Sequence, residues 1–295
     1  MKHNRKAILF AIMAAALYAI NSPFSKILLD KIPPTLMAAL LYLGAGIGLL
    51  IVGLIQHLMG KGQNEKRLTR KEMPFTIAMV ILDIAALIFL MVGLKLTTAA
   101  NASLLYNFEI VATSIIALFI FKETISKRLW LAIILVVIAS VILSVKDFSS
   151  LSFSFGSIFV LLACICWGIE NNFTRVISNK STLQIAVIKG LGSGSGALLI
   201  AMILGEKAAD MAYILAALIL GFFAYGLSVY FYVRAQRDLG AAKTSTFNAI
   251  APFIGVILSL LIFQELPSRS FLVALTIMLI GAYFAAMDYK KRKQS

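Results

Sequence analysis

The sequence predicts an all-α membrane protein in which ten transmembrane helices form two inverted five-helix repeats. Of its 295 residues, 61% are hydrophobic and 14% are charged, whereas soluble domains average about 45–50% and about 25%. The apolar residues fall in blocks of about 20, the length with which a helix crosses about 30 Å of hydrocarbon. Residues of the first half also recur in the same order in the second half. Together these observations exclude a soluble globular domain.

Five apolar runs define the spans of the first half, residues 1–148. Each is bounded by a charged or Pro/Gly-containing segment, where a membrane helix ends. The first begins after MKHNRK, the second at Pro34, the third after the charged stretch before residue 75, and the last two flank the segment KETISKR. The predicted spans are 7–29, 34–58, 75–95, 99–121 and 128–146.

The second half, residues 149–295, contains five more runs with the same kind of boundaries. Ser-rich and charged segments separate the first three, and Arg234, Arg237 and Lys243 separate the eighth span from the ninth. The predicted spans are 155–178, 183–204, 210–233, 243–263 and 268–288. Because ten spans are an even number, both termini are expected on one side of the membrane.

Basic residues predict the orientation. Twenty Lys and Arg residues flank the spans on the side of the termini and six flank them on the opposite side. The positive-inside rule therefore places both termini in the cytoplasm, and the expected location is the plasma membrane. The net charge of +14 does not predict nucleic-acid binding, because the basic residues lie in loops and at the two ends. A cleaved signal peptide at the start is the alternative for the first span, but residues 18–26 have a counterpart in mid-chain, where no signal peptide occurs.

An internal repeat relates the two halves. A shift of 149 aligns Tyr18, Phe24, Ser25 and Lys26 with Trp167, Phe173, Thr174 and Arg175. A shift of 148 superposes the glycines at 44, 46 and 48 on those at 192, 194 and 196. Five spans are an odd number, so the copies cross the membrane in opposite directions, as alternating access by exchange of conformations requires. A duplication that merely built a stable bundle is the alternative.

Several segments resemble a known family. The start of span four (TTAANASLLYN), its counterpart GAAKTSTFNAIAP and the span ends FIFKE and LIFQE are similar to the EamA-like branch of the drug/metabolite transporter superfamily, over about residues 7–288. The resemblance implies a monomeric secondary transporter, often an exporter of amino acids, amines or other small metabolites, with a central cavity between the halves. One departure is Glu109, which is followed by Ile110 and not by proline.

Four ionisable residues lie inside predicted spans, namely Asp83, Glu109, Glu170 and Lys189. Each costs about 2.5–3.5 kcal/mol to insert, so each needs a reason to be there. Trp167, Glu170, Asn171 and Thr174 follow helical spacing, which predicts a recognition stripe in span six. The span-one counterpart is Tyr18, Asn21, Ser22 and Ser25. A stripe that only makes interhelical hydrogen bonds is the alternative.

These patterns define the candidate site. Span four contributes Tyr106 and Glu109, and span eight contributes Tyr225, whose ring suits an organic cation or packs as an ordinary membrane aromatic. Lys189 is expected to pair with Glu170, to bind a substrate carboxylate, or to reach the membrane surface. The predicted substrate-binding residues are Tyr18, Asn21, Tyr106, Glu109, Trp167, Glu170, Asn171 and Tyr225. The predicted proton-coupling residues are Glu170, Glu109 and Asp83, with Glu170 as the place where a proton and a cation compete.

No catalytic triad, zinc motif or phosphate loop occurs in the sequence, and its only histidines are His3 and His57. We therefore expect no enzyme activity, no metal and no cofactor. The predicted function is a secondary transporter, an exporter or exchanger of a small amine-bearing metabolite, coupled to protons by antiport. A non-transporting membrane sensor or scaffold is the alternative, and a channel is disfavoured because pore rings are missing.

Overall fold

The computed structural model describes residues 2–59, 66–122, 125–147, 152–177, 180–207, 210–239 and 250–291. It is helical apart from a small antiparallel hairpin, β1 (Val145–Asp147) with β2 (Ser152–Phe153). Nine of the described helical segments are long and apolar enough to cross a membrane, and α13 is a shorter apolar helix. The prediction of an all-α membrane fold is confirmed. The hairpin was not predicted, since the fifth span was expected to continue to residue 146.

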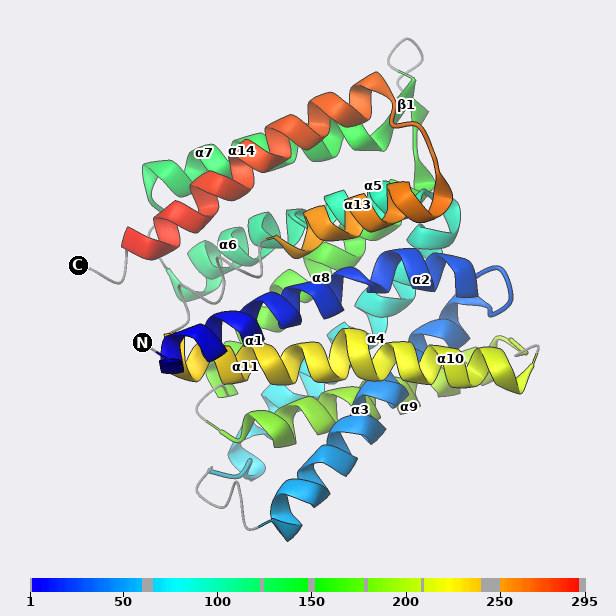
Figure 1. The fold of residues 1–295 in the computed structure, drawn as a ribbon, viewed down its shortest axis with the longest axis vertical. Coiled ribbons are helices and arrows are strands. Elements are labelled where there is room, and N and C mark those ends of the chain that lie inside the picture. The colour runs from blue at the N-terminus through cyan, green and yellow to red at the C-terminus, as the bar shows by residue number, and fades with distance from the viewer. Residues whose placement is uncertain are drawn as a thin grey trace.

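The first half runs from α1 to α7 (Figure 1). Its helices are α1 (Lys2–Ala19), α2 (Asn21–Leu28), α3 (Pro34–Leu58), the short 3-10 turn η1 (Arg70–Glu72), α4 (Met73–Leu96), α5 (Ala99–Leu105), α6 (Phe108–Phe121) and α7 (Lys127–Ser144). The second half comprises α8 (Phe155–Ile177), α9 (Thr182–Ile203), α10 (Met211–Gly221), the π-helical η2 (Phe222–Leu227), α11 (Ser228–Leu239), α13 (Ala251–Phe263) and α14 (Arg269–Lys291). Both termini lie at the same end of the bundle (Figure 1).

The packing of the helices has the symmetry of the repeat, so that exchanging the two halves reproduces the same pairings. Equivalent crossings pack on one another, the second on the seventh (α3 on α9), the fifth on the tenth (α7 on α14) and the fourth on the ninth (α5 on α13). The remaining strong contacts come in related pairs, so that α4 on α8 matches α1 on α11, and α6 on α8 matches α1 on α13. The chain therefore has the predicted inverted five-helix repeats. Its centre lies between two groups that each mix both halves, the α4 group (α4, α5, α6, α8) and the α1 group (α1, α2, α10, η2, α11, α13).

Within the described residues, three crossings depart from a regular α-helix near their middle. The first breaks at Ile20, between α1 and α2, where Pro23 has no N–H to donate to the Ala19 carbonyl. The fourth breaks at Tyr106 and Asn107, between α5 and α6, without a proline. The eighth contains η2. Pro23 accounts for the first break, whereas the other two crossings contain no proline.

Glycines allow the closest helix contacts. A Cβ on Gly190 would lie 2.5 Å from the Gly46 nitrogen, so α9 and α3 touch backbone to backbone. A Cβ on Gly44 would overlap the Leu218 carbonyl of α10. These glycines thus form small-residue surfaces on which the helices approach closely.

Substitution of Gly44 by alanine should therefore lower stability, because neither backbone can move aside. Overpacking of this kind costs about 1–3 kcal/mol. Gly53→Ala is the matched control on the same helix, since its Cβ would meet only the end of the Leu183 side chain at 3.0 Å. Thermal unfolding in detergent should show a lower midpoint for Gly44→Ala than for Gly53→Ala. Equal midpoints would contradict this account of the α3–α10 contact.

Candidate functional site

A layer of aromatic rings occupies the centre of the bundle, at the level of the helix breaks. The Tyr18 ring lies 6.1 Å from Tyr106 and 6.0 Å from Tyr225. Tyr106 packs edge-on against Trp167 at 6.2 Å, and Tyr225 lies 5.7 Å from Tyr42. We call these five residues the aromatic layer. Tyr42 comes from α3 and the other four rings come from the α1 and α4 groups, so the layer lies where the groups meet.

Asn21 joins the two groups by hydrogen bonds. Its side-chain amide donates to the Tyr225 hydroxyl at 2.8 Å and to the Tyr106 hydroxyl at 3.2 Å. Ser22 also donates to Tyr106, at 3.1 Å, and Ser25 donates to the Asn21 carbonyl oxygen at 3.0 Å. Asn21, Ser22 and Ser25 are no more than 1% exposed. The span-one stripe is thus a buried hydrogen-bonding face, and Asn21 places two phenol groups side by side.

An ionic cluster of three residues, Asp83, Glu170 and Lys189, adjoins the aromatic layer. The Lys189 ammonium lies 3.3 Å from Asp83 Oδ2 and 3.1 Å from Glu170 Oε2. The Tyr42 hydroxyl donates to Asp83 Oδ1 at 2.9 Å, and the Thr174 hydroxyl donates to Glu170 Oε1. All four carboxylate oxygens are therefore engaged, although Asp83 and Glu170 are 0% and 1% exposed. With both carboxyl groups ionised, the ionic cluster has a net charge of −1.

The ionic cluster connects the two halves of the chain. Asp83 lies on α4 in the first half, whereas Glu170 on α8 and Lys189 on α9 belong to the second. Tyr42 is the link to the aromatic layer, because its ring contacts Tyr225 while its hydroxyl binds Asp83. A change at the ionic cluster can thus reach the aromatic layer through a single side chain.

Glu109 forms a second acidic position on the other side of α8. Its Oε1 accepts a hydrogen bond of 2.6 Å from the Asn171 amide, which also lies 3.5 Å from the Thr113 hydroxyl. The predicted span-six stripe therefore divides, with Asn171 facing α6 and Glu170 facing α9. Adjacent positions on a helix point about 100° apart, which explains the division.

Most of the predicted site residues meet in these three places. One place contains Tyr18, Asn21, Tyr106, Trp167 and Tyr225. Glu170 forms an ion pair with Lys189, which was one of the three roles expected for Lys189. Glu109 accepts a hydrogen bond from Asn171. Asp83 has no polar neighbour along its own helix, and its partners come from α3 and α9. The sequence analysis missed Tyr42. A lone tyrosine in an apolar span carries no signal, and its repeat counterpart is Gly190.

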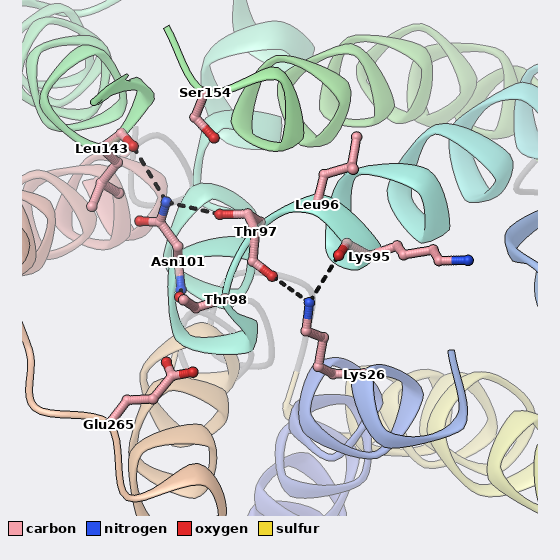
Figure 2. A pocket seen from close by; sticks show the side chains of 9 residues that line it. All are labelled: Lys26, Lys95, Leu96, Thr97, Thr98, Asn101, Leu143, Ser154 and Glu265. Atoms are coloured by element: carbon pink, nitrogen blue, oxygen red, sulfur yellow. Dashed lines mark hydrogen bonds between the residues drawn. The ribbon is translucent and has the colours of Figure 1, made fainter. Parts of the chain in front are cut away.

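A pocket of about 440 Å³ lies beside the ends of α2 and α4, away from the end of the bundle where α1 begins (Figure 1), and Figure 2 shows its lining. Lys26 donates from α2 to the carbonyl oxygens of Leu94, Lys95 and Thr97 at 2.7, 3.1 and 2.7 Å. These bonds use all three ammonium hydrogens and satisfy carbonyl groups at the end of α4. Glu265 faces them across the pocket (Figure 2). Lys26 therefore holds the ends of the first and third crossings together.

Some sequence-based expectations fall outside the described residues. They concern Glu123 and residues 240–249, which include most of the GAAKTSTFNAIAP motif and the first part of the predicted span 243–263. Within the described ranges, no three His, Cys, Asp or Glu side chains are grouped as a metal site would require.

Inverted helical halves around buried polar groups define a polytopic membrane protein of the kind that moves small solutes. The chain belongs to the EamA-like transporter family, whose model matches residues 5–145 and 154–287. It is a membrane transporter.

Known relatives agree with this assignment. An uncharacterized transporter of Methanothermobacter thermautotrophicus is 29% identical over 86% of this chain and 78% of its own length. The uncharacterized transporter YyaM of Bacillus subtilis is 24% identical over 57% of this chain and 58% of its own. A solved crystal structure superposes with a TM-score of 0.68 over 97% of both chains at 18% identity, which shows the fold alone.

The Glu109–Asn171 bond gives a stability prediction. Asn171→Leu should destabilise the protein, because it leaves the Glu109 carboxylate without its 2.6 Å donor. Glu109→Gln removes the charge, so Asn171→Leu should cost less in that background. Hydrogen bonds to charged groups are worth about 1.5–3 kcal/mol, and the coupling energy in a double-mutant cycle from detergent unfolding should fall in this range. A coupling near zero would show that the bond does not support the fold.

Proposed function

We propose that this transporter exchanges protons for a small amine-bearing metabolite, an amino acid or an organic cation, by alternating access. The observation that carries the proposal is the ionic cluster, in which two buried carboxyl groups share the single ammonium of Lys189 beside the aromatic layer. When both carboxyl groups are ionised, the cluster carries one net negative charge. A charge buried away from water favours neutralisation. One proton or one cation neutralises the cluster, whereas both together overcharge it. Competition of this kind is what couples an exchanger.

The aromatic layer suits a cation. Ring faces attract ammonium groups with energies of about 0.5–2 kcal/mol, more strongly where water is excluded. Tyr18, Tyr106, Trp167 and Tyr225 surround the place where the α1 and α4 groups meet, and Tyr42 leads from there to Asp83. Tyr18, Asn21, Tyr106, Trp167 and Tyr225 would hold the organic part of the substrate, and Glu170, Glu109, Asn171 and Asp83 its charge or the proton.

Alternating access is supported by the packing. Among the described helices, the strong pairings of crossings map on themselves or on another pairing when the halves, residues 1–148 and 149–295, are exchanged. Exchange of the two conformations then moves the opening from one membrane face to the other. Because a single chain contains both halves, we propose that the monomer is the transporting unit. The basic loops favour the plasma membrane with both termini in the cytoplasm, and an inward proton gradient would then drive export.

Glu170→Gln tests the coupling. The substitution keeps the side-chain volume and imitates the permanently protonated form. It should abolish pH-gradient-driven flux in proteoliposomes loaded with a panel of amines, amino acids and quaternary ammonium compounds. Asp30→Asn is the control, since Asp30 is exposed. Wild-type pH-driven flux in Glu170→Gln would assign coupling to Glu109 or Asp83, and no pH-driven flux of any compound in the wild type would favour the sensor or scaffold alternative.

Cysteine labelling tests the orientation. In a background without Cys164 and Cys166, single cysteines replace Lys66, in the loop before η1, and Lys207, between α9 and α10. A membrane-impermeant maleimide added to intact cells should label position 207 and spare position 66. Permeabilised cells should label both, which controls for reactivity. Labelling of position 66 in intact cells would reverse the proposed orientation.

A further inference from the structure

Lys189 is held in a way that resembles the binding of a ligand. Its ammonium lies between Asp83 Oδ2 and Glu170 Oε2, at 3.3 and 3.1 Å. The other oxygen of each carboxylate is fixed independently, Oδ1 of Asp83 by Tyr42 and Oε1 of Glu170 by Thr174. The two acids therefore form a clamp whose geometry does not depend on Lys189 alone.

We infer that Lys189 is a tethered counter-cation that occupies the position of the substrate ammonium group and is displaced when the substrate binds. The inference rests on the proposed function and adds to it the chemistry of recognition, which is one ammonium group between two carboxylates. In the empty transporter, Lys189 neutralises one of the two buried charges. A bound substrate replaces that interaction, so the carboxylates are never left without a positive partner.

The Lys189 side chain can move away from the two carboxylates toward water. Its side chain is 29% exposed, whereas those of Asp83 and Glu170 are 0% and 1% exposed. It lies two helical turns after Thr182, where α9 begins. A lysine stem is long enough to carry its ammonium toward water while the methylene groups stay in apolar surroundings. When the substrate displaces it, the Lys189 ammonium therefore moves toward the membrane surface.

The other ionisable groups near the clamp have partners of their own. Glu109, on α6, accepts from Asn171. Tyr230 of α11, a helix that also packs on α9, accepts a hydrogen bond from Gln56 of α3 at 2.8 Å. The clamp that Lys189 leaves therefore consists of Asp83 and Glu170, with the hydroxyls of Tyr42 and Thr174 at its back.

The repeat makes the clamp single. The counterparts of Asp83, Glu170 and Lys189 in the other half, at shifts of 142, 149 and 148, are Tyr225, Asn21 and Leu41, none of which is charged at neutral pH. One ammonium site per chain follows.

Chemical labelling of the wild-type protein tests displacement directly. Purified protein is treated with acetic anhydride with and without tetramethylammonium, a small permanent ammonium ion that has no proton of its own and no amine to acetylate. Mass spectrometry then measures acetylation of Lys189 relative to the exposed Lys31. We expect acetylation of Lys189 to rise several-fold with the cation, because the ammonium leaves its carboxylates. Unchanged or reduced acetylation overturns the inference.

Binding measurements give an independent readout. A tethered competitor acts at an effective concentration in the millimolar range or above, so Lys189→Met should bind tetramethylammonium about tenfold more tightly than wild type, by calorimetry. Lys189→Arg keeps the counter-cation and should bind like wild type. If Lys189→Met alone fails to fold, the same test is made in an Asp83→Asn background, which has one buried carboxylate fewer. Cation affinity is then compared between Asp83→Asn and the double variant Asp83→Asn, Lys189→Met.

Absence of tightening in both backgrounds overturns the inference. This failure is distinct from failure of the proposed function. If the wild type shows pH-driven flux that Glu170→Gln abolishes, while removal of Lys189 leaves cation affinity unchanged, exchange at Glu170 stands and Lys189 is only a structural partner.

Discussion

The ion pairs of Lys189 are the interaction on which the centre of this transporter depends. In the hydrocarbon core, a carboxylate cannot be hydrated, and removal of one partner from a buried pair costs about 3–5 kcal/mol. Asp83 and Glu170 therefore need a cation from the protein itself. Because the three side chains come from α4, α8 and α9, their pairing fixes those helices relative to one another. It also orients Tyr42, which leads to the aromatic layer.

The helix breaks follow from the same constraint. Regular helices satisfy their own backbone and leave side chains as the only polar groups at membrane depth. The helices are interrupted at Ile20 and at Tyr106–Asn107. At the same level, Asn21, Ser22 and Tyr106 form a buried hydrogen-bonded group. Irregular backbone inside a membrane is tolerated where protein or a polar cavity surrounds it. The breaks thus lie where the α1 and α4 groups meet and where polar side chains converge.

The fold could be predicted from the sequence because both the hydropathy pattern and the internal repeat extend over long segments of the chain. It was also sufficient for the identity of most polar residues, since a charge within an apolar span is conspicuous. It could not supply partners that come from other helices. Asp83 appeared isolated in the sequence because its partners Tyr42 and Lys189 are distant along the chain. Tyr42 was indistinguishable from an ordinary packing residue. Likewise, helical spacing grouped Glu170 with Asn171, but contacts with α9 and α6 divide them.

Asymmetry between the halves explains why a duplicated chain suits this site. Two identical copies would place the same residues on both sides of the pseudo-twofold axis, so a second set of two acids and a lysine would stand where Tyr225, Asn21 and Leu41 now lie. Such a centre would bury four carboxylates around one small space, and like charges at close range strongly oppose joint ionisation. In a fused chain, one half keeps the acids and the lysine while the other supplies neutral hydroxyl, amide and ring groups. The fold retains the symmetry that exchange of conformations needs, and the chemistry becomes one-sided.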